Sequence, residues 1–295
     1  MAHVDLSVRI VRYFVAIVDA GTYTSAAERL HVATPSLSQQ IRKLERDLGV
    51  TLIDRDHRGV RLTPAGTEFL PVAIELLAVH DRAVAVARRR RRASRNQLRI
   101  GFFATVAGDR TRTILDRLRE AAPDADVQLV QIGWGEQSEA VLEGRVDVAF
   151  ARPPLAATDL REIPVLEEPR VLAMSAQNVL ASKRVIHPGD LADVVQVNTD
   201  IASEMWRNWW SIDPRPDGSR ARYGPVVHGT EEMLEVVATS DAVAITAESV
   251  VSAFPRADVA YRPIVDVEPA KLVLLAPLVS QPLIDELIEI VTHLS

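Results

Sequence analysis

Short strand-like and helix-like runs of apolar residues alternate along the chain from Leu98 to its end. The strand-like runs are Leu98–Phe102, Val127–Ile132, Val146–Phe150, Val171–Met174, Val194–Val197, Val243–Thr246 and Leu272–Leu275. The helix-like runs between them include Thr111–Ala122, Gln137–Glu143, Glu231–Thr239 and Pro282–Leu294. Because strands joined through helices are usually parallel, this alternation predicts mostly parallel sheets with helices on both faces. Roughly 200 residues are enough for one large or two small α/β units.

The residues before this region predict short helices instead. Apolar residues recur at helical spacing in residues 10–18, and a second helix is expected from near Thr24 or Ser25. A third helix should follow, because Thr34 has the hydroxyl of an N-cap and Pro35 fits the first turn, where its missing N–H costs nothing. Two compact helices joined by about three residues are the pattern of a helix-turn-helix.

A short β-hairpin is expected after the third helix. Residues 51–53 and 59–62 have strand-like character, and they flank a polar turn at residues 54–58. The arginines at the tip and base of this hairpin are Arg55, Arg58 and Arg61. A hairpin in this place forms the wing of a winged helix-turn-helix, and we refer to residues 1–62 as the head.

A long helix is expected from Thr63-Pro64 to about Arg92. One apolar stripe on it consists of Leu70, Ala73, Leu77, Val84 and Ala87. A second stripe consists of Phe69, Val72, Leu76, Val79, Ala83 and Val86. One stripe can pack on the head while the other packs on a second copy, so the two stripes predict a dimer. Pro71 removes one helical hydrogen bond and should kink the helix early.

The charges of the chain are unevenly distributed. Residues 1–92 hold 15 Lys and Arg against 10 Asp and Glu, a net charge of +5, whereas residues 93–295 hold 19 against 30, a net charge of −11. A basic N-terminal part on an acidic remainder suggests that the N-terminal part alone meets a polyanion. Ordinary variation in surface charge is the alternative, and charge alone does not decide between the two.

Several classes of site lack the residues that they would need. The sequence has no cysteine, which excludes disulfides and thiol catalysis, and its seven histidines are scattered without metal-ligand spacing. It has neither a Gly-x-Ser-x-Gly elbow nor a glycine-rich phosphate loop. We therefore expect no catalytic residue, no metal and no cofactor. The chain also shows no signal peptide and no run of about 18 apolar residues, so a cytoplasmic protein without a membrane span is expected.

Residues throughout the chain resemble the LysR-type transcriptional regulators. The matching residues of the head, at nearly ungapped spacing, are Phe14-Val15-Ala16, Gly21, Ala26-Ala27-Glu28-Arg29-Leu30, Pro35-Ser36-Leu37-Ser38-Gln39-Gln40-Ile41, Leu44-Glu45, Leu48-Gly49, Leu52, Arg55 and Leu62-Thr63-Pro64-Ala65-Gly66. The matching residues of the body are Leu98-Arg99-Ile100-Gly101, residues 142–150, Glu232-Met233-Leu234, Val237-Ala238 and Val243-Ala244-Ile245-Thr246. The resemblance covers nearly the whole chain and weakens toward its end.

The resemblance implies a multidomain α/β architecture, in which the effector domain resembles periplasmic binding proteins. Its parts are a winged helix-turn-helix DNA-binding domain (1–62), a linker and dimerisation helix (63–95), effector lobe one (96–163 and 268–295) and effector lobe two (164–267). The two crossover strands of the hinge are expected near Ile163–Leu166 and Val265–Glu268. Members of the family usually form dimers or tetramers, so a homodimer or a homotetramer is expected.

The third helix is expected to read double-stranded DNA. A helix fits the major groove, and Gln39 in its first half could pair with adenine through two hydrogen bonds. Arg42 and Lys43 are better placed for phosphates, and the arginines of the wing suit phosphates or the minor groove. The predicted DNA-binding residues are Thr34, Pro35, Ser36, Ser38, Gln39, Arg42, Lys43, Arg55, Arg58 and Arg61. The family often has Gln at the position of Thr34 and Arg at that of Gln39, so the operator sequence stays open.

Five consecutive arginines, Arg88 to Arg92, end the long helix. Because successive residues turn by about 100°, the run surrounds the helix and cannot form a single contact face. Two interpretations remain for these residues. A solvated helix end, which complements the negative pole of the helix macrodipole, is favoured over a contact with DNA.

The effector site is expected between the lobes, at the carboxyl ends of strands, where open α/β sheets bind ligands. The predicted effector-binding residues are Thr105, Trp134, Gly135, Asn198, Thr199 and Thr246. Hydroxyls and free N–H groups at helix starts favour an anionic small molecule such as a carboxylate. The family commonly has Ser or Thr at the position of Trp134. The indole could form a stacking wall for the ligand or a plug that fills the cleft, and the sequence leaves both open.

Three classes of function follow from these observations. The leading class is a ligand-responsive, sequence-specific transcriptional regulator. The second is a regulator of the same fold that no longer senses a ligand, because Trp134 fills its cleft. The third is an α/β enzyme, which would leave the helix-turn-helix unexplained. The sequence does not identify the effector, the operator or the target genes, and it does not distinguish activation from repression.

Overall fold

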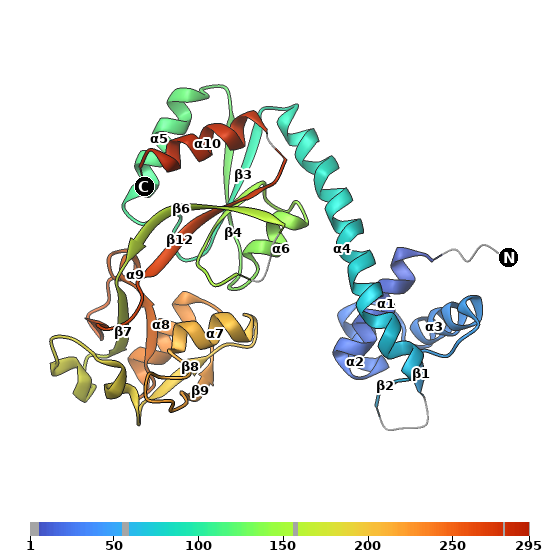
Figure 1. The fold of residues 1–295 in the computed structure, drawn as a ribbon, viewed down its shortest axis with the longest axis horizontal. Coiled ribbons are helices and arrows are strands. Elements are labelled where there is room, and N and C mark those ends of the chain that lie inside the picture. Colours follow the sequence, from blue (N-terminus) through green and yellow to red (C-terminus); the bar gives the residue numbers. More distant parts are fainter. Residues whose placement is uncertain (1–5, 55–58, 156–158, 280, 295) are drawn as a thin grey trace. The chain divides into compact units, whose positions relative to one another are not determined.

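The computed structural model describes residues 6–54, 59–155, 159–279 and 281–294. The chain divides into two compact units, which we call the N-terminal unit (Met1–Val84) and the C-terminal unit (Ala85–Ser295) (Figure 1). The finer domain boundaries expected from the sequence stay predictions. Among the described helices, none combines the length and the apolar character that crossing a bilayer requires.

Three short helices pack around one apolar core in the N-terminal unit. They are α1 (Val8–Ala20), α2 (Tyr23–Arg29) and α3 (Thr34–Leu48). Apolar residues three and four positions apart face this core, and among them Phe14 and Leu37 are fully buried. The predicted pair of helices with a short turn between them is therefore present, and it rests on α1.

The starts of two of these helices differ from the prediction. The hydroxyl of Thr22 caps α2, because it accepts a hydrogen bond from the backbone N–H of Ser25 at 3.1 Å. With this cap α2 begins one or two residues earlier than predicted, and Tyr23 packs against the core. Thr34 is the first residue of α3 rather than its N-cap, which is Ala33 and makes no side-chain hydrogen bond.

The wing is a minimal antiparallel hairpin in which β1 (Ile53–Asp54) pairs with β2 (Arg61–Leu62). The long helix α4 (Pro64–Ala93) begins directly afterwards, and the hydroxyl of Thr63 caps it by accepting a hydrogen bond from the N–H of Gly66 at 3.0 Å. A Cβ at Gly66 would lie only 2.0 Å from the backbone carbonyl oxygen that precedes β1. The wing and the first turn of α4 therefore pack backbone against backbone.

Two faces of α4 have different surroundings. The helix continues through Pro71 without interruption, and Ala73 is buried in the core of the N-terminal unit. The residues of α4 that pack against the same core include Phe69, Leu70, Leu76 and Leu77. On another face Val72, Val79 and Val86 are 59%, 50% and 55% exposed. Because these valines are seven residues apart, they recur on one side of the helix. Both predicted stripes contribute to the head, and the exposed valines belong to the second.

The C-terminal unit contains two lobes, and the larger sheet lies in lobe one. Its strand order is β4-β3-β5-β12-β6, in which β3 is parallel to β4 and β5, and β12 is antiparallel to β5 and β6. These strands are β3 (Gln97–Phe102), β4 (Asp126–Gln131), β5 (Val148–Ala151), β6 (Leu160–Glu168) and β12 (Ala270–Pro277). The helices of this lobe are α5 (Arg110–Ala121), α6 (Gln137–Leu142) and α10 (Pro282–Thr292). α5 and α10 share one apolar core and α6 belongs to another, so helices cover both faces of the sheet.

Lobe two contains two smaller sheets. In the larger one β7 lies between β10 and β11 and is antiparallel to both, whereas β8 and β9 form a parallel pair. The strands are β7 (Arg170–Ser175), β8 (Val195–Asn198), β9 (Arg222–Val226), β10 (Ala244–Ala247) and β11 (Val259–Pro263). The helices are η1 (Val179–Ser182), η2 (Pro188–Leu191), α7 (Glu204–Ser211), α8 (Thr230–Thr239) and α9 (Glu248–Ala253). The expectation of mostly parallel sheets is wrong for the three-stranded sheet of lobe two, because its strands do not come from successive strand–helix–strand units.

Two chain segments join the lobes. Only Pro169 separates β6 from β7, so the first crossing lies slightly beyond the predicted Ile163–Leu166, and the second lies between β11 and β12, around the predicted Val265–Glu268. Arg170 ties the two crossings together. Its guanidinium donates hydrogen bonds to the carbonyl oxygen of Glu268 at 2.9 Å and to a carbonyl oxygen of α7 at 2.8 Å. Burial among these groups lowers the pKa of Arg170 to about 10.

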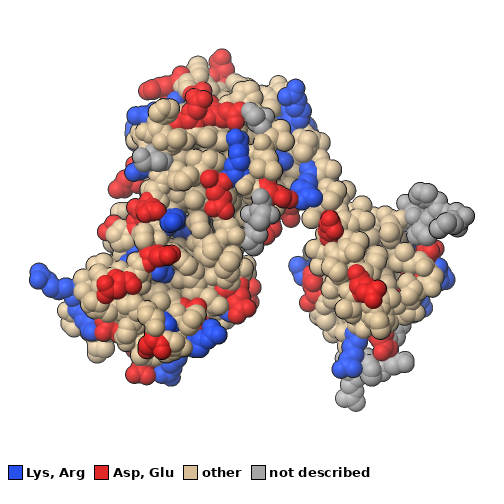
Figure 2. Space-filling model, viewed as in Figure 1, with Lys and Arg blue, Asp and Glu red and all other residues tan. Residues whose placement is uncertain are grey.

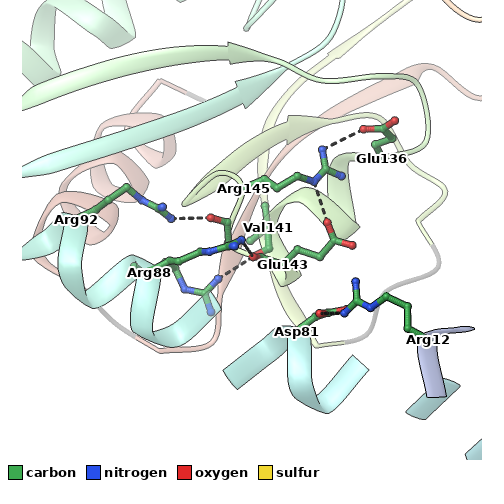
Figure 3. A network of polar contacts seen from close by, with 10 residues as sticks. Arg12, Asp81, Arg88, Arg92, Glu136, Val141, Glu143 and Arg145 are labelled. Atoms are coloured by element: carbon green, nitrogen blue, oxygen red, sulfur yellow. Dashed lines mark hydrogen bonds and ion pairs between the residues drawn. The ribbon is translucent and has the colours of Figure 1, made fainter. Parts of the chain in front are cut away.

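The arginine run at the end of α4 is partly buried against the segment between α6 and β5 (Figure 3). Arg92 forms an ion pair with Asp147, with 2.7 Å between Nη2 and Oδ1, and the two side chains are 13% and 2% exposed. Arg89, only 8% exposed, donates a hydrogen bond to the carbonyl oxygen of Val141 at 2.7 Å, and burial lowers its pKa. Arg88 donates to the carbonyl oxygen of the residue after α6 at 3.3 Å.

The favoured interpretation of this run as a solvated helix end is therefore wrong for Arg89 and Arg92. Apart from Asp147, the acceptors are the carbonyl oxygens of Val141, Glu143 and Gly144 at the end of α6, where the helix macrodipole places partial negative charge. The backbones also approach closely, since a Cβ at Gly144 would lie 2.7 Å from the Cα of Ala85. We call Arg88, Arg89 and Arg92, with Asp147, the arginine clamp.

Candidate functional site

The exposed face of α3 carries most of the residues predicted to contact DNA. Leu37, Ile41 and Leu44 hold the helix against the core, which directs the residues between them outward. The exposed residues are Pro35, Ser36, Gln39, Arg42 and Lys43, and the half-buried ones are Thr34 and Ser38. The sequence has no acidic residue between Thr34 and Lys43. This face is therefore polar to basic, and a negatively charged surface can approach it without repulsion from carboxylates.

The wing adds one described arginine to this surface. Arg61 on β2 is exposed, whereas Arg55 and Arg58 lie outside the described residues. Sequence reasoning missed Glu45, which is 9% exposed on α3. Its Oε1 accepts hydrogen bonds from the backbone N–H groups of Leu52 at 3.0 Å and Ile53 at 3.2 Å. Glu45 thus fixes the entry of the wing to the helix, and nothing in the sequence distinguished it from its charged neighbours Arg46 and Asp47.

Five of the six predicted effector-binding residues line two small hollows between the lobes. Thr105 and Thr246 line the first, which has a volume of about 30 Å³, and Asn198 and Thr199 line the second, which has about 40 Å³. Trp134 lines both. Since a single water needs roughly 10–15 Å³ of such space, these hollows are too small for a metabolite.

Trp134 fills much of the cleft in this conformation. It belongs to lobe one and is 8% exposed, yet it packs in a core cluster with lobe-two residues such as Met233 and Val237. Its ring centroid lies 5.8 Å from that of Trp206, which in turn lies 5.6 Å from Trp210. The indole Nε1 of Trp206 donates a hydrogen bond to the carbonyl oxygen of Arg152 in lobe one at 3.1 Å. The tryptophans therefore hold the lobes together where a ligand was expected.

Sequence reasoning missed Arg152, which lines the first hollow and is 6% exposed. Its Nη2 donates to Oε1 of Glu168 at 2.5 Å and to Oγ of Ser249 at 3.0 Å, but its Nη1 is buried and lacks a hydrogen-bond partner in the described chain. The buried hydroxyl of Thr199 is unpartnered among the same residues. Unsatisfied donors on both lobes fit an anionic ligand. The signal for Arg152 was its place directly after a buried strand.

Gly135 lies near the hollows but does not line them. Its φ of +75° favours glycine, and a Cβ would lie 2.8 Å from the carbonyl oxygen of Ile201 and 2.9 Å from the Cα of Ala202. Gly135 therefore allows close approach of the backbones of the two lobes rather than forming part of a cavity wall.

Comparisons with known proteins match both parts of the chain. Residues 8–67 match the model of bacterial regulatory helix-turn-helix proteins of the lysR family, and residues 91–293 match the LysR substrate binding domain. The regulator ClcR of Pseudomonas putida is 41% identical over 144 residues, which are 49% of each chain. The hca operon activator HcaR of Escherichia coli K12 is 36% identical over 195 residues, which are 66% of each chain. These alignments span about half to two thirds of the curated relatives. Full-length CbnR in complex with its target DNA is 27% identical, with a TM-score of 0.54 over 98% of this chain and 99% of that chain.

Proposed function

Because the chain belongs to the LysR family of bacterial regulatory helix-turn-helix proteins, we propose that it is a sequence-specific DNA-binding transcriptional regulator that responds to a small-molecule effector. The observation that carries this proposal is the exposed face of α3, which has no acidic residue from Thr34 to Lys43. The similar protein CbnR was solved on its target DNA. The function places the chain in the cytoplasm. We assign it no enzymatic activity, since the curated relatives named above are regulators.

Within this function we assign a role to each part of the chain. Residues 1–62 bind double-stranded DNA, with Gln39 reading a base and Arg42 and Lys43 contacting phosphates. Residues 63–95 form the linker, and Val72, Val79 and Val86 contribute to contact with a second copy in a homodimer or homotetramer. What supports this contact is the exposure of three valines on one helix side, where burial against another chain removes apolar surface from water.

The cleft between the lobes is assigned to an anionic effector. Support comes from Nη1 of Arg152 and the hydroxyl of Thr199, which are buried donors without partners in the described chain. A carboxylate could accept hydrogen bonds from both kinds of donor. The two hollows are too small for such a molecule, so the effector has to displace Trp134 from its place against Trp206.

A second candidate function is a regulator of the same fold that senses no ligand in this cleft. The specific observation that favours it is the burial of Trp134 in a cluster of lobe-two residues. In that case the indole is a permanent part of the core, and the chain regulates through DNA binding and assembly alone.

Binding to the DNA that flanks the coding sequence tests the proposed function. We expect full-length protein to protect a defined site from nuclease and to prefer it over a scrambled duplex by about 10³-fold or more. Gln39→Ala should change the preferred base at one position, by about 1–3 kcal/mol. Gln40→Ala, the same change at a half-buried neighbour, should not. Equal affinity of the wild-type protein for the flanking and scrambled duplexes would contradict sequence-specific binding.

A further inference from the structure

A third hollow, far larger than the two in the cleft, lies beside the end of α4. Its volume is about 540 Å³, and β3, β4 and the residues after α6 form its other walls. The lining includes Arg88, Arg91, Arg92, Arg95, Arg99 and Arg145, and it includes no Asp or Glu. On the face shown in Figure 2, acidic and basic side chains are both spread over the C-terminal unit. A lining with six arginines and no acidic residue therefore contrasts with the net charge of −11 of residues 93–295.

The fold explains how these arginines come to face one space. Arg88, Arg91 and Arg92 are three and four residues apart and so share one side of α4, and Arg95 lies in the turn that follows. On β3 the neighbours Leu98 and Ile100 are buried in the core, which directs Arg99 to the other face of the sheet. Arginines from a helix, a strand and a loop therefore line the same hollow.

Several of these guanidinium groups lack a counter-charge. Arg92 is paired with Asp147, and Arg145 with Glu136 and Glu143. The side chains of Arg91, Arg95 and Arg99 form no ion pair or hydrogen bond with the described residues, and Nε of Arg99 is a buried donor without an acceptor. Leaving a buried donor unpaired is unfavourable, as is placing like charges together. An anion in the hollow would accept a hydrogen bond from the unpaired donor and would reduce the repulsion between the guanidinium groups.

The geometry points to a binding site for a small molecule that carries at least two phosphate groups, and we propose this site as separate from the effector cleft. Guanidinium groups bind phosphate oxygens through two parallel hydrogen bonds, and several converging arginines suit a ligand with several phosphates. The volume lies within the range of about 300–1,000 Å³ that is usual for small-ligand sites. Val130 and Ile132 add an apolar wall that a base or a carbon skeleton can contact.

Occupation of this site would act on the end of α4. Arg88 and Arg92 belong both to the hollow and to the arginine clamp, so a bound phosphate competes with Asp147 and the carbonyl oxygens after α6 for the same donors. The ligand would therefore change how firmly the last turns of α4 are held. This gives the chain a second ligand site besides the cleft, and this site includes residues of α4 itself.

Calorimetric titration of the full-length protein with inorganic tripolyphosphate tests the site. At fixed ionic strength we expect saturable binding with one ligand per chain, and weaker binding of orthophosphate. The double variant Arg91→Gln/Arg95→Gln should weaken tripolyphosphate binding at least tenfold. The matched control Arg112→Gln/Arg117→Gln removes the same charge from exposed positions on α5 and should change it less than twofold. Equal weakening in the two variants, or no saturable binding by the wild type, would overturn the proposal.

A DNA-binding measurement separates this site from a second DNA contact. If Arg91 and Arg95 bind the ligand as proposed, the double variant keeps wild-type affinity for duplex DNA in the absence of tripolyphosphate. A loss of DNA affinity as large as the loss of tripolyphosphate affinity would show that these arginines contact the DNA backbone, and the proposed ligand would be wrong. The titration with tripolyphosphate contains no DNA. A failure of the proposed site would therefore appear in the titration, whereas a failure of the proposed regulatory function would appear in the DNA-binding experiment.

Discussion

Some charged side chains are buried in the C-terminal unit, and the contribution of each to stability depends on its burial and its partners. Asp147 accepts hydrogen bonds from Arg92 and from the backbone N–H of Arg99, and its side chain is 2% exposed. Asp116 also has arginine partners, Arg112 and Arg119, but these groups are largely exposed to water. Removing one member of a buried pair leaves an uncompensated charge, whereas water screens an exposed pair.

We therefore expect Asp147→Ala to lower the free energy of unfolding of the C-terminal unit by about 3–5 kcal/mol. The matched change Asp116→Ala should lower it by less than about 1 kcal/mol. Denaturant unfolding followed by circular dichroism measures both. Equal, small effects would mean that the buried pair at the end of α4 is not formed in solution.

Trp134 is the single residue on which the two candidate functions differ. Replacing it with Ser removes most of a buried indole, so we expect a loss of about 3–5 kcal/mol in stability and a larger cleft. A thermal-shift screen with small mono- and dicarboxylates should then show saturable stabilisation that exceeds that of the wild type.

Trp134→Phe is the control for this experiment, because it keeps an aromatic ring in the cleft and should behave like the wild type. Loss of a carboxylate response that the wild type possesses would instead identify Trp134 as a stacking wall for the ligand.

At the scale of single elements, different sides of α4 have different roles: one side packs on the core, and others are exposed. Leu77 packs on the core of the N-terminal unit, whereas Val79 and Ile74 are exposed on different sides of the helix. A substitution at Leu77 would therefore disturb folding of the head and says little about assembly. Exposed positions test assembly more cleanly, because they leave the core of the chain intact.

Val79→Glu should give monomers in sedimentation velocity experiments, since an unpaired carboxylate buried between two helices costs several kcal/mol. Ile74→Glu also introduces a carboxylate at an exposed position, five residues earlier and on a side about 140° away, and should leave the oligomer intact. If both variants sediment as the wild type does, the valine face of α4 is not the contact between copies.

The sequence predicted elements that depend on residues nearby in the chain, and it did not predict contacts between segments that are distant in the sequence. Helices such as α3 and the strand β3 follow from apolar spacing within a few residues. β6 was expected only through the family resemblance, as the crossover strand near Ile163–Leu166, because the four charged residues and the proline of Leu160–Glu168 hide its strand character. The arginine run was misinterpreted because periodicity describes a helix by itself, whereas Arg92 meets Asp147 from a segment 55 positions later. Arg152 and the tight packing of Trp134 likewise depend on contacts between segments distant in sequence.

At the scale of the whole molecule, charge is divided between the parts of the chain. The net +5 of residues 1–92 comes from Arg88–Arg92, since residues 1–87 hold ten Lys and Arg against ten Asp and Glu. Under the proposed function the polyanion therefore meets the basic residues on the exposed face of α3 and on the wing, and the net −11 of residues 93–295 discourages non-specific adhesion to DNA. The affinity for DNA should then depend on the few basic residues of the head and on salt.

We expect the dissociation constant for the operator to rise by about 10³-fold or more between roughly 50 and 200 mM salt, if six or more phosphates are contacted. Arg42→Ala should weaken binding to all sequences alike and reduce the slope of log K against log salt by about 1 for each lost contact. Fluorescence anisotropy over a salt series measures both quantities. An unchanged slope would remove Arg42 from the phosphate contacts.

The arginine clamp also gives α4 a mechanical role. Gly144 and the clamp fix the last turns of a 30-residue helix, which at about 1.5 Å per residue is roughly 45 Å long. A lever of that length magnifies small rotations: a tilt of about 5° at the clamped turns moves the opposite end by about 4 Å, by the same geometry. One base-pair step is about 3.4 Å. A slight reorientation near Gly144 is therefore enough to shift the register of contact along a duplex by one step.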